Sequence, residues 1–172
     1  MVRAWYLDEK LVAQNKSDPC LTEENVTLDD LLKIGFDADE YENNEEYNSL
    51  KKKRGYSYQD NITINRCSMP NYDEMTERFF KEHIHQDEEI RFILDGCGYF
   101  DVRDTNDRWI RVEVTKNDLL VLPPGIYHRF AIDNSDYIKV IRLFQGEPVW
   151  TAFFRPADDF EERKNYTTKY YT

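Results

Sequence analysis

From about residue 83 onward, apolar and polar residues alternate with the period of two that is typical of half-buried β-strands. The stretches between them are rich in Asp, Asn, Gly and Pro, which favour tight turns. Six or more short antiparallel strands joined by such turns predict a β-barrel or jelly roll. The candidate strands are Glu88–Leu94, Tyr99–Arg103, Trp109–Val114, Leu119–Leu122, His128–Ile132 and Tyr137–Phe144.

The first eighty residues have a different pattern, which predicts helices joined by short turns. Thr27 and Asp30 form a candidate capping box before a leucine-rich stretch, and Gly35 suits the end of that helix. A second helix is predicted over about Glu45–Arg54, and a third after Asn71. The third helix would turn three apolar side chains inward, namely Met75, Phe79 and Phe80.

A chain of 172 residues with 40% hydrophobic and 15% aromatic residues is long and apolar enough for one domain with a real core. We therefore expect a mainly β protein, a barrel with an N-terminal α-helical extension, in a single domain. Its expected parts are the helical extension (about 1–80), the barrel core (about 83–150) and a C-terminal segment (151–172).

The formal net charge of -11 argues against nucleic acid as a partner, because binding phosphates requires a basic patch. The N-terminal residues lack the apolar core of a signal peptide, and no stretch is long and apolar enough to span a bilayer, so we expect no membrane insertion. Three unpatterned cysteines suit reduced thiols in the cytoplasm. A mass of 20.7 kDa leaves the nucleus open as a second location.

The three histidines of the chain all fall in two short segments with metal-ligand spacing. His83 and His85 are separated by one residue, so an extended backbone directs both imidazoles to one face, and Glu89 shares their parity. His128 follows the turn Pro123-Pro124-Gly125 on a separate strand. Three histidines and one carboxylate suit Fe(II), Ni(II), Mn(II) or Zn(II) and would leave two adjacent positions of an octahedral ion open. We predict one mononuclear metal centre.

Two arginines share this parity, Arg91 beside Glu89 and Arg142 on the last predicted strand. Buried arginines require an anion or a carboxylate, so they either orient an anionic substrate or form salt bridges with the many acidic residues. Three aromatic residues are candidate pocket walls, although strand aromatics lie in the core by default. They are Phe92, Phe130 and Phe144.

The two histidine segments resemble the paired motifs of the cupin superfamily, G-x5-H-x-H-x3,4-E-x6-G and G-x5-P-x-G-x2-H-x3-N. Glu77 and Asn117 stand where the motifs have their first glycines, and Ile132 replaces the final asparagine. These departures alter turns and remove no ligand.

Longer segments are similar to the acireductone dioxygenase family of eukaryotic type, and the resemblance spans nearly the whole chain. Asn117, where the family usually has glycine, and a variable region around residues 10–25 depart from it. The segments that carry the resemblance are 1–6, 70–72, 83–104, 122–130, 142–150 and 155–158.

The resemblance implies a cupin barrel and a role in methionine salvage. With Fe(II), the family converts 1,2-dihydroxy-5-(methylthio)pent-1-en-3-one and O2 to 4-methylthio-2-oxobutanoate and formate. With Ni(II), it yields 3-(methylthio)propanoate, carbon monoxide and formate. By position, the metal ligands are His83, His85, Glu89 and His128, with Arg91 and Arg142 near the substrate.

Other functions remain open at this point. The chain could be a cupin enzyme that acts on a different enediol or thiol, or an isomerase. It could also be a non-catalytic metal-binding cupin or a protein-interaction module. We expect a monomer that binds one Fe(2+) or Ni(2+) per chain, with acireductone and O2 as small-molecule partners.

Overall fold

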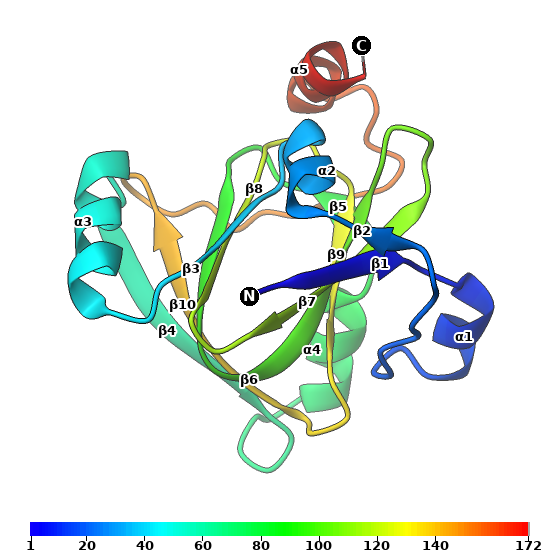
Figure 1. Ribbon diagram of the computed structural model, residues 1–172, viewed down its shortest axis with the longest axis horizontal. Coiled ribbons are helices and arrows are strands. Elements are labelled where there is room, and N and C mark those ends of the chain that lie inside the picture. Colours follow the sequence, from blue (N-terminus) through cyan, green and yellow to red (C-terminus); the bar gives the residue numbers. More distant parts are fainter. Residues whose placement is uncertain (172) are drawn as a thin grey trace.

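The computed structural model describes residues 1–171, and they fold into a mainly β molecule with short helices around it (Figure 1). The strands are β1 (Arg3–Tyr6), β2 (Asn25–Val26), β3 (Asp37–Glu40), β4 (Tyr58–Asn65), β5 (His83–Ile84), β6 (Glu89–Arg103), β7 (Trp109–Thr115), β8 (Asp118–Leu122), β9 (His128–Ile132), β10 (Tyr137–Phe144) and β11 (Phe153–Phe154). The helices are α1 (Glu9–Gln14), α2 (Leu28–Lys33), α3 (Asn44–Arg54), α4 (Tyr72–Phe79) and α5 (Glu161–Tyr170).

Strand β6 belongs to two antiparallel layers and joins them into the barrel. Its first half, residues 89–96, pairs with β8 and β10, and these strands continue the layer to β3 and β4. Its second half, residues 97–103, pairs with β7 and β9 in the layer that also holds β1, β2, β5 and β11. The predicted mainly β cupin fold is thereby confirmed.

The prediction of two separate strands over 88–103, divided by a turn at residues 95–98, was wrong. Gly96 has a φ of +81°, a backbone conformation that glycine adopts without a Cβ penalty. A Cβ at this position would lie 2.5 Å from the Tyr137 carbonyl oxygen. The register with β10 shifts between Lys139 and Val140, so β6 bends from one layer into the other without ending.

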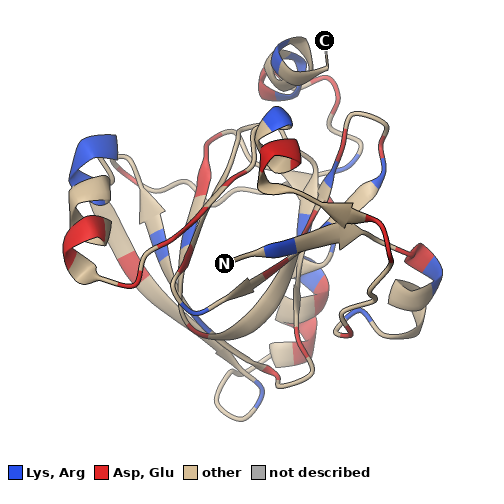
Figure 2. Cartoon of the chain, in the orientation of Figure 1, with Lys and Arg blue, Asp and Glu red and all other residues tan. Residues whose placement is uncertain are grey.

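The expectation that the first eighty residues are helical was correct for three helices and missed four strands. Thr27 forms the capping box of α2 with Asp30, Asn43 caps α3, and Gly55 ends α3 with a φ of +71°. Acidic residues begin α3 and basic residues end it, as the helix dipole favours (Figure 2). Strands β1 to β4, however, extend both layers. Short helices α1 and α5 were not predicted either.

The main core lies between the two layers, and further contacts attach the helices. Phe36, Ile93 and Leu120 are completely or almost completely buried in this core. Helix α5 covers the same end of the barrel as α2 (Figure 1), and the Tyr166 hydroxyl donates to the Ile34 carbonyl oxygen at 2.8 Å. Among residues 1–171, no helix has the length and apolar character needed to cross a membrane.

Candidate metal centre

The structure brings the four predicted ligands together from three parts of the barrel. His83 lies in β5, and His85 directly follows that strand. Glu89 begins β6, and His128 begins β9, where it pairs directly with His83 across the ladder. One ligand atom from each of these side chains lies within 4.8 Å of every other. Residues far apart in sequence therefore form a single cluster.

Each histidine uses its Nδ1 nitrogen to donate to a backbone carbonyl oxygen, which leaves Nε2 for the cluster. The acceptors are Lys81 for His83 at 2.7 Å, Thr151 for His85 at 2.8 Å, and Ile126 for His128 at 2.9 Å. A carbonyl oxygen accepts hydrogen bonds only, so Nδ1 carries the proton. Such contacts fix the tautomer and ring orientation of metal-bound histidines.

The Glu89 carboxylate closes the cluster. Its Oε2 atom lies 3.0 Å from His128 Nε2 and 3.1 Å from His85 Nε2. With Nδ1 protonated, Nε2 of a neutral imidazole is an acceptor, so it repels the carboxylate oxygen unless a proton or a cation lies between them. A divalent cation satisfies all four groups at once, so this donor set fits a metal ion.

The pKa values of His83 and Glu89 also favour a cation. Burial and the neighbouring His128 lower the pKa of His83 to about 3, so this imidazole is neutral at physiological pH. Burial raises the pKa of Glu89, but the charge of Arg91 and the neighbouring His128 outweigh burial and hold the pKa well below its ordinary value. Burial lowers the pKa of His85, but the hydrogen bond that its imidazolium donates to the Glu89 carboxylate, together with the charge of that carboxylate, outweighs burial, and the net pKa is raised.

A cavity of about 520 Å³ opens onto the cluster, and both predicted arginines line it. Arg91 donates to the Ile90 carbonyl oxygen at 3.0 Å and lies 3.5 Å from the Glu89 carboxylate. Arg142 forms a two-point ion pair with Asp60. The alternative that these arginines form salt bridges is thus also correct, because each one has a carboxylate partner, Glu89 for Arg91 and Asp60 for Arg142.

The three predicted phenylalanines separate into one that lines this cavity and two that do not. Phe130 lines it, next to Phe79. Phe92 lies in another cluster, stacked on Tyr47 of α3 with ring centroids 4.2 Å apart. Its parity is opposite to that of Arg91, so the strand directs it away from the cavity. Phe144 is buried outside the cavity, against the edge of Trp150.

Sequence reasoning missed the cavity residues that come from α4 and from the chain after β10. Met75 and Phe79 lie one helical turn apart, and they had been expected to face inward without a link to the site. Arg78, on the same helix, is exposed, and no ion pair joins it to any residue within 1–171. The remaining wall consists of Trp150, Thr151, Ala152 and Phe154.

A smaller apolar pocket of about 110 Å³ adjoins the cavity. The two share Glu89 and the arginines Arg91 and Arg142, so charged groups lie at one end. The other walls are apolar, namely Ile62, Ile64, Phe79, Phe100, Phe130 and Val140. The site therefore suits a small ligand with an anionic head and an apolar tail.

An antiparallel barrel with three histidines and one glutamate converging beside a cavity defines a cupin with a candidate mononuclear metal centre. The model of the ARD/ARD' family matches residues 3–152, which is most of the chain. The chain belongs to this family.

Proteins of known name agree with this assignment over the full length. Acireductone dioxygenase from Ciona intestinalis is 50% identical, and the match covers 100% of this chain and 98% of that protein. The Rattus norvegicus acireductone dioxygenase is 49% identical over 96% of both chains. A solved acireductone dioxygenase from Bacillus anthracis, with a cadmium ion in its active centre, has a TM-score of 0.66 at 26% identity and covers 74% of this chain and 87% of that one.

Proposed function

We propose that this protein is a metal-dependent acireductone dioxygenase of methionine salvage. With Fe(II) it converts 1,2-dihydroxy-5-(methylthio)pent-1-en-3-one and O2 to 4-methylthio-2-oxobutanoate and formate, and with Ni(II) to 3-(methylthio)propanoate, carbon monoxide and formate. The observation that carries the proposal is the convergence of three histidines, one glutamate and two arginines on one cavity. The full-length similarity to acireductone dioxygenases supports it.

His83, His85, Glu89 and His128 would hold one Fe(2+) or Ni(2+) per chain, because their oriented Nε2 atoms and carboxylate form a donor set that suits either ion. The bound ion supplies Lewis-acid stabilisation of negative charge on substrate oxygens. The carbonyl contacts at Nδ1 keep the imidazoles in one orientation, so the ligand set requires little rearrangement.

The other cavity residues act on the substrate itself. Arg91 and Arg142 would balance the negative charge of the deprotonated enediol, which lowers the energy needed to remove its proton. The enediol would lie at the charged end of the cavity, with its methylthioethyl tail in the apolar pocket beside Phe79 and Phe130. Such a tail also displaces water from the reacting carbons.

The chain carries everything that this site requires. The four candidate ligands and both arginines of the proposed site lie in one copy of the chain, so the proposed chemistry draws on no residue of a second copy. All three cysteines are free, which supports a reducing compartment such as the cytoplasm.

The first experiment removes the metal, reloads the protein without oxygen with either Fe(II) or Ni(II), and analyses the products made from acireductone and O2. We expect formate and 4-methylthio-2-oxobutanoate from the iron form, and carbon monoxide from the nickel form. Metal-loaded protein that leaves acireductone unchanged would refute the activity and return the chain to the non-catalytic or other cupin functions.

A further inference from the structure

Asp60 holds the side chain of Arg142 in a two-point ion pair. The Nε atom of Arg142 donates to Oδ1 of Asp60 at 2.8 Å, and Nη2 donates to Oδ2 at 2.6 Å. The two residues are direct partners across β4 and β10, so the backbone register sets their distance. Such planar two-point pairs are short and restrict the guanidinium to one orientation.

Two aromatic side chains complete this arrangement. The Tyr58 hydroxyl donates to Oδ2 of Asp60 at 2.8 Å, which restricts the carboxylate. The guanidinium of Arg142 lies 4.2 Å from the ring centre of Trp150, and the Tyr58 ring meets the edge of the same indole at 6.1 Å. Arg142 is therefore restricted in its plane by a carboxylate and on its face by an aromatic ring.

The ion pair leaves part of Arg142 for a ligand. Nε and Nη2 bind Asp60, whereas Nη1 has no hydrogen-bond partner anywhere in residues 1–171. Arg142 lines both the cavity and the apolar pocket, while Asp60 lines neither of them. Asp60 thus contacts the arginine from behind the cavity wall, and an anion in the cavity can meet the remaining amino group.

We propose that Asp60, restricted by Tyr58, is a positioning residue that fixes Arg142 for the anionic substrate. The inference rests on the proposed function and names a residue that acts only through Arg142. An arginine that is already ordered loses less rotamer freedom when it binds an anion. Loss of the ion pair should therefore weaken substrate binding more than it slows the chemical step.

The central test is a double-mutant cycle on the metal-loaded protein, with Asp60→Asn, Arg142→Gln and the double variant. We expect Asp60→Asn to raise KM about tenfold and to change kcat less than about twofold. This pattern results when a substitution weakens binding of the substrate and of the transition state equally. In the Arg142→Gln background, Asp60→Asn should have no further effect on KM. If the effects of the two substitutions on KM multiply in the double variant, Asp60 acts independently of Arg142 and the proposal is overturned.

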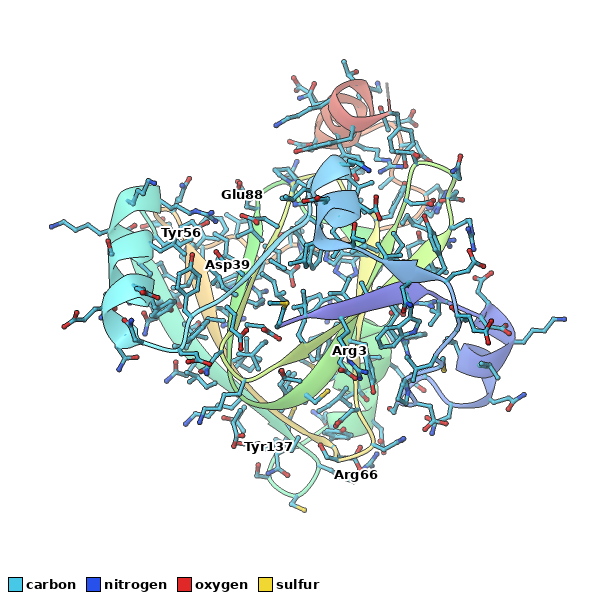
Figure 3. All side chains as sticks on the ribbon, viewed as in Figure 1. Arg3, Asp39, Tyr56, Arg66, Glu88 and Tyr137 are labelled. Atoms are coloured by element: carbon cyan, nitrogen blue, oxygen red, sulfur yellow. The ribbon has the colours of Figure 1, made fainter. Side chains whose placement is uncertain are left out.

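Two further variants test whether Asp60 positions Arg142 or only stabilises the fold. Asp136→Asn is the matched control, because Asp136 forms a similar pair with Arg66 (2.9 Å) beside the same two strands. Unlike Arg142, Arg66 lines neither the cavity nor the apolar pocket, and it lies at the lower edge of the molecule in Figure 3. It should leave KM unchanged. Tyr58→Phe keeps the ion pair and should raise KM only about twofold. If Asp60→Asn folds poorly, an unchanged KM in Tyr58→Phe would itself count against the proposal.

A binding measurement tests the inference without turnover. Trp150 lies against Arg142, so its fluorescence should report an anion bound there, and Trp150→Phe identifies that signal. The product 4-methylthio-2-oxobutanoate is the probe. We expect Asp60→Asn to weaken its binding about tenfold, in line with the expected rise in KM. Failure of the wild type to turn over acireductone would refute the proposed function, whereas probe binding unaffected by Asp60→Asn would refute the positioning role.

Discussion

At the scale of single residues, the Glu89 carboxylate contacts two histidines and one arginine of the site. One carboxylate oxygen faces two imidazole nitrogens, and the other lies 3.5 Å from the Arg91 guanidinium. The adjacent Glu88 has the opposite parity and is exposed (Figure 3), and it does not line the main cavity. We therefore propose that only Glu89 of these two consecutive glutamates is a metal ligand, because Glu88 precedes β6 and is exposed to solvent.

Substitution of these two residues tests the ligand set. We expect Glu89→Gln to weaken Ni(II) binding by more than about 100-fold, because even residues that only support a ligand are worth 10- to 100-fold. Glu88→Gln should bind the ion like the wild type. Competition titration with a chelator measures the Ni(II) affinity of both variants. In thermal unfolding, excess metal should stabilise the wild type and Glu88→Gln but not Glu89→Gln. Equal affinities would exclude Glu89 as a ligand.

Asn117 shows why a departure from the family pattern is tolerated. Its φ of +75° lies in the left-handed region, where glycine is favoured and asparagine is the best-accepted alternative. We expect Asn117→Gly to change the free energy of unfolding by less than about 1 kcal/mol, and Asn117→Val to lower it by about 1–3 kcal/mol. Chemical denaturation of the three proteins measures this difference, and an equally stable valine variant would contradict the strain argument.

At the scale of elements, the bend in β6 determines where the two layers meet. Gly96→Ala would add both left-handed strain and a Cβ close to the backbone of β10. Gly55→Ala is the matched control, because Gly55 has a similar φ of +71° and no atom within 4 Å of its Cβ position. We expect a loss of about 1 kcal/mol at Gly55 and of at least about 3 kcal/mol at Gly96. If denaturant unfolding gives equal losses of unfolding free energy for the two variants, the close approach of the added Cβ to β10 has no energetic cost.

Most barrel strands and the cluster of three histidines and Glu89 were predictable, because alternation and the spacing of the ligand types can be read from the sequence. Strand β4 was missed because its inward positions include Asp60, whose charge interrupts the apolar alternation over residues 58–65. The Asp60 side chain is stabilised there by its ion pair with Arg142 and by the Tyr58 hydroxyl, and no local pattern of the sequence indicates that Asp60 and Arg142 pair across the strands. Phe92, a candidate pocket wall with the core as its default place, lies in the core, and alternation along β6 could not show that its partner is Tyr47 in the distant helix α3.

At the scale of the whole molecule, the cavity has a charge opposite to that of the protein. The chain carries a net charge of -11, which repels an anionic substrate at long range. Three arginines line the cavity, whereas Glu89 is its one acidic wall residue. Arg91 and Arg142 are paired with carboxylates, so the exposed Arg78 is the cation at the cavity that no carboxylate neutralises among residues 1–171.

This arrangement predicts that Arg78 attracts the substrate. Arg78→Gln should lower kcat/KM about threefold at about 0.01 M salt, where charges interact over about 30 Å, and the difference should disappear near 1 M salt. We expect kcat to stay unchanged, because attraction before binding does not alter the bound state. Lys10→Gln removes the same charge from α1, outside the cavity, and is the control. A loss that persists at high salt would instead mean that Arg78 contacts the bound substrate directly.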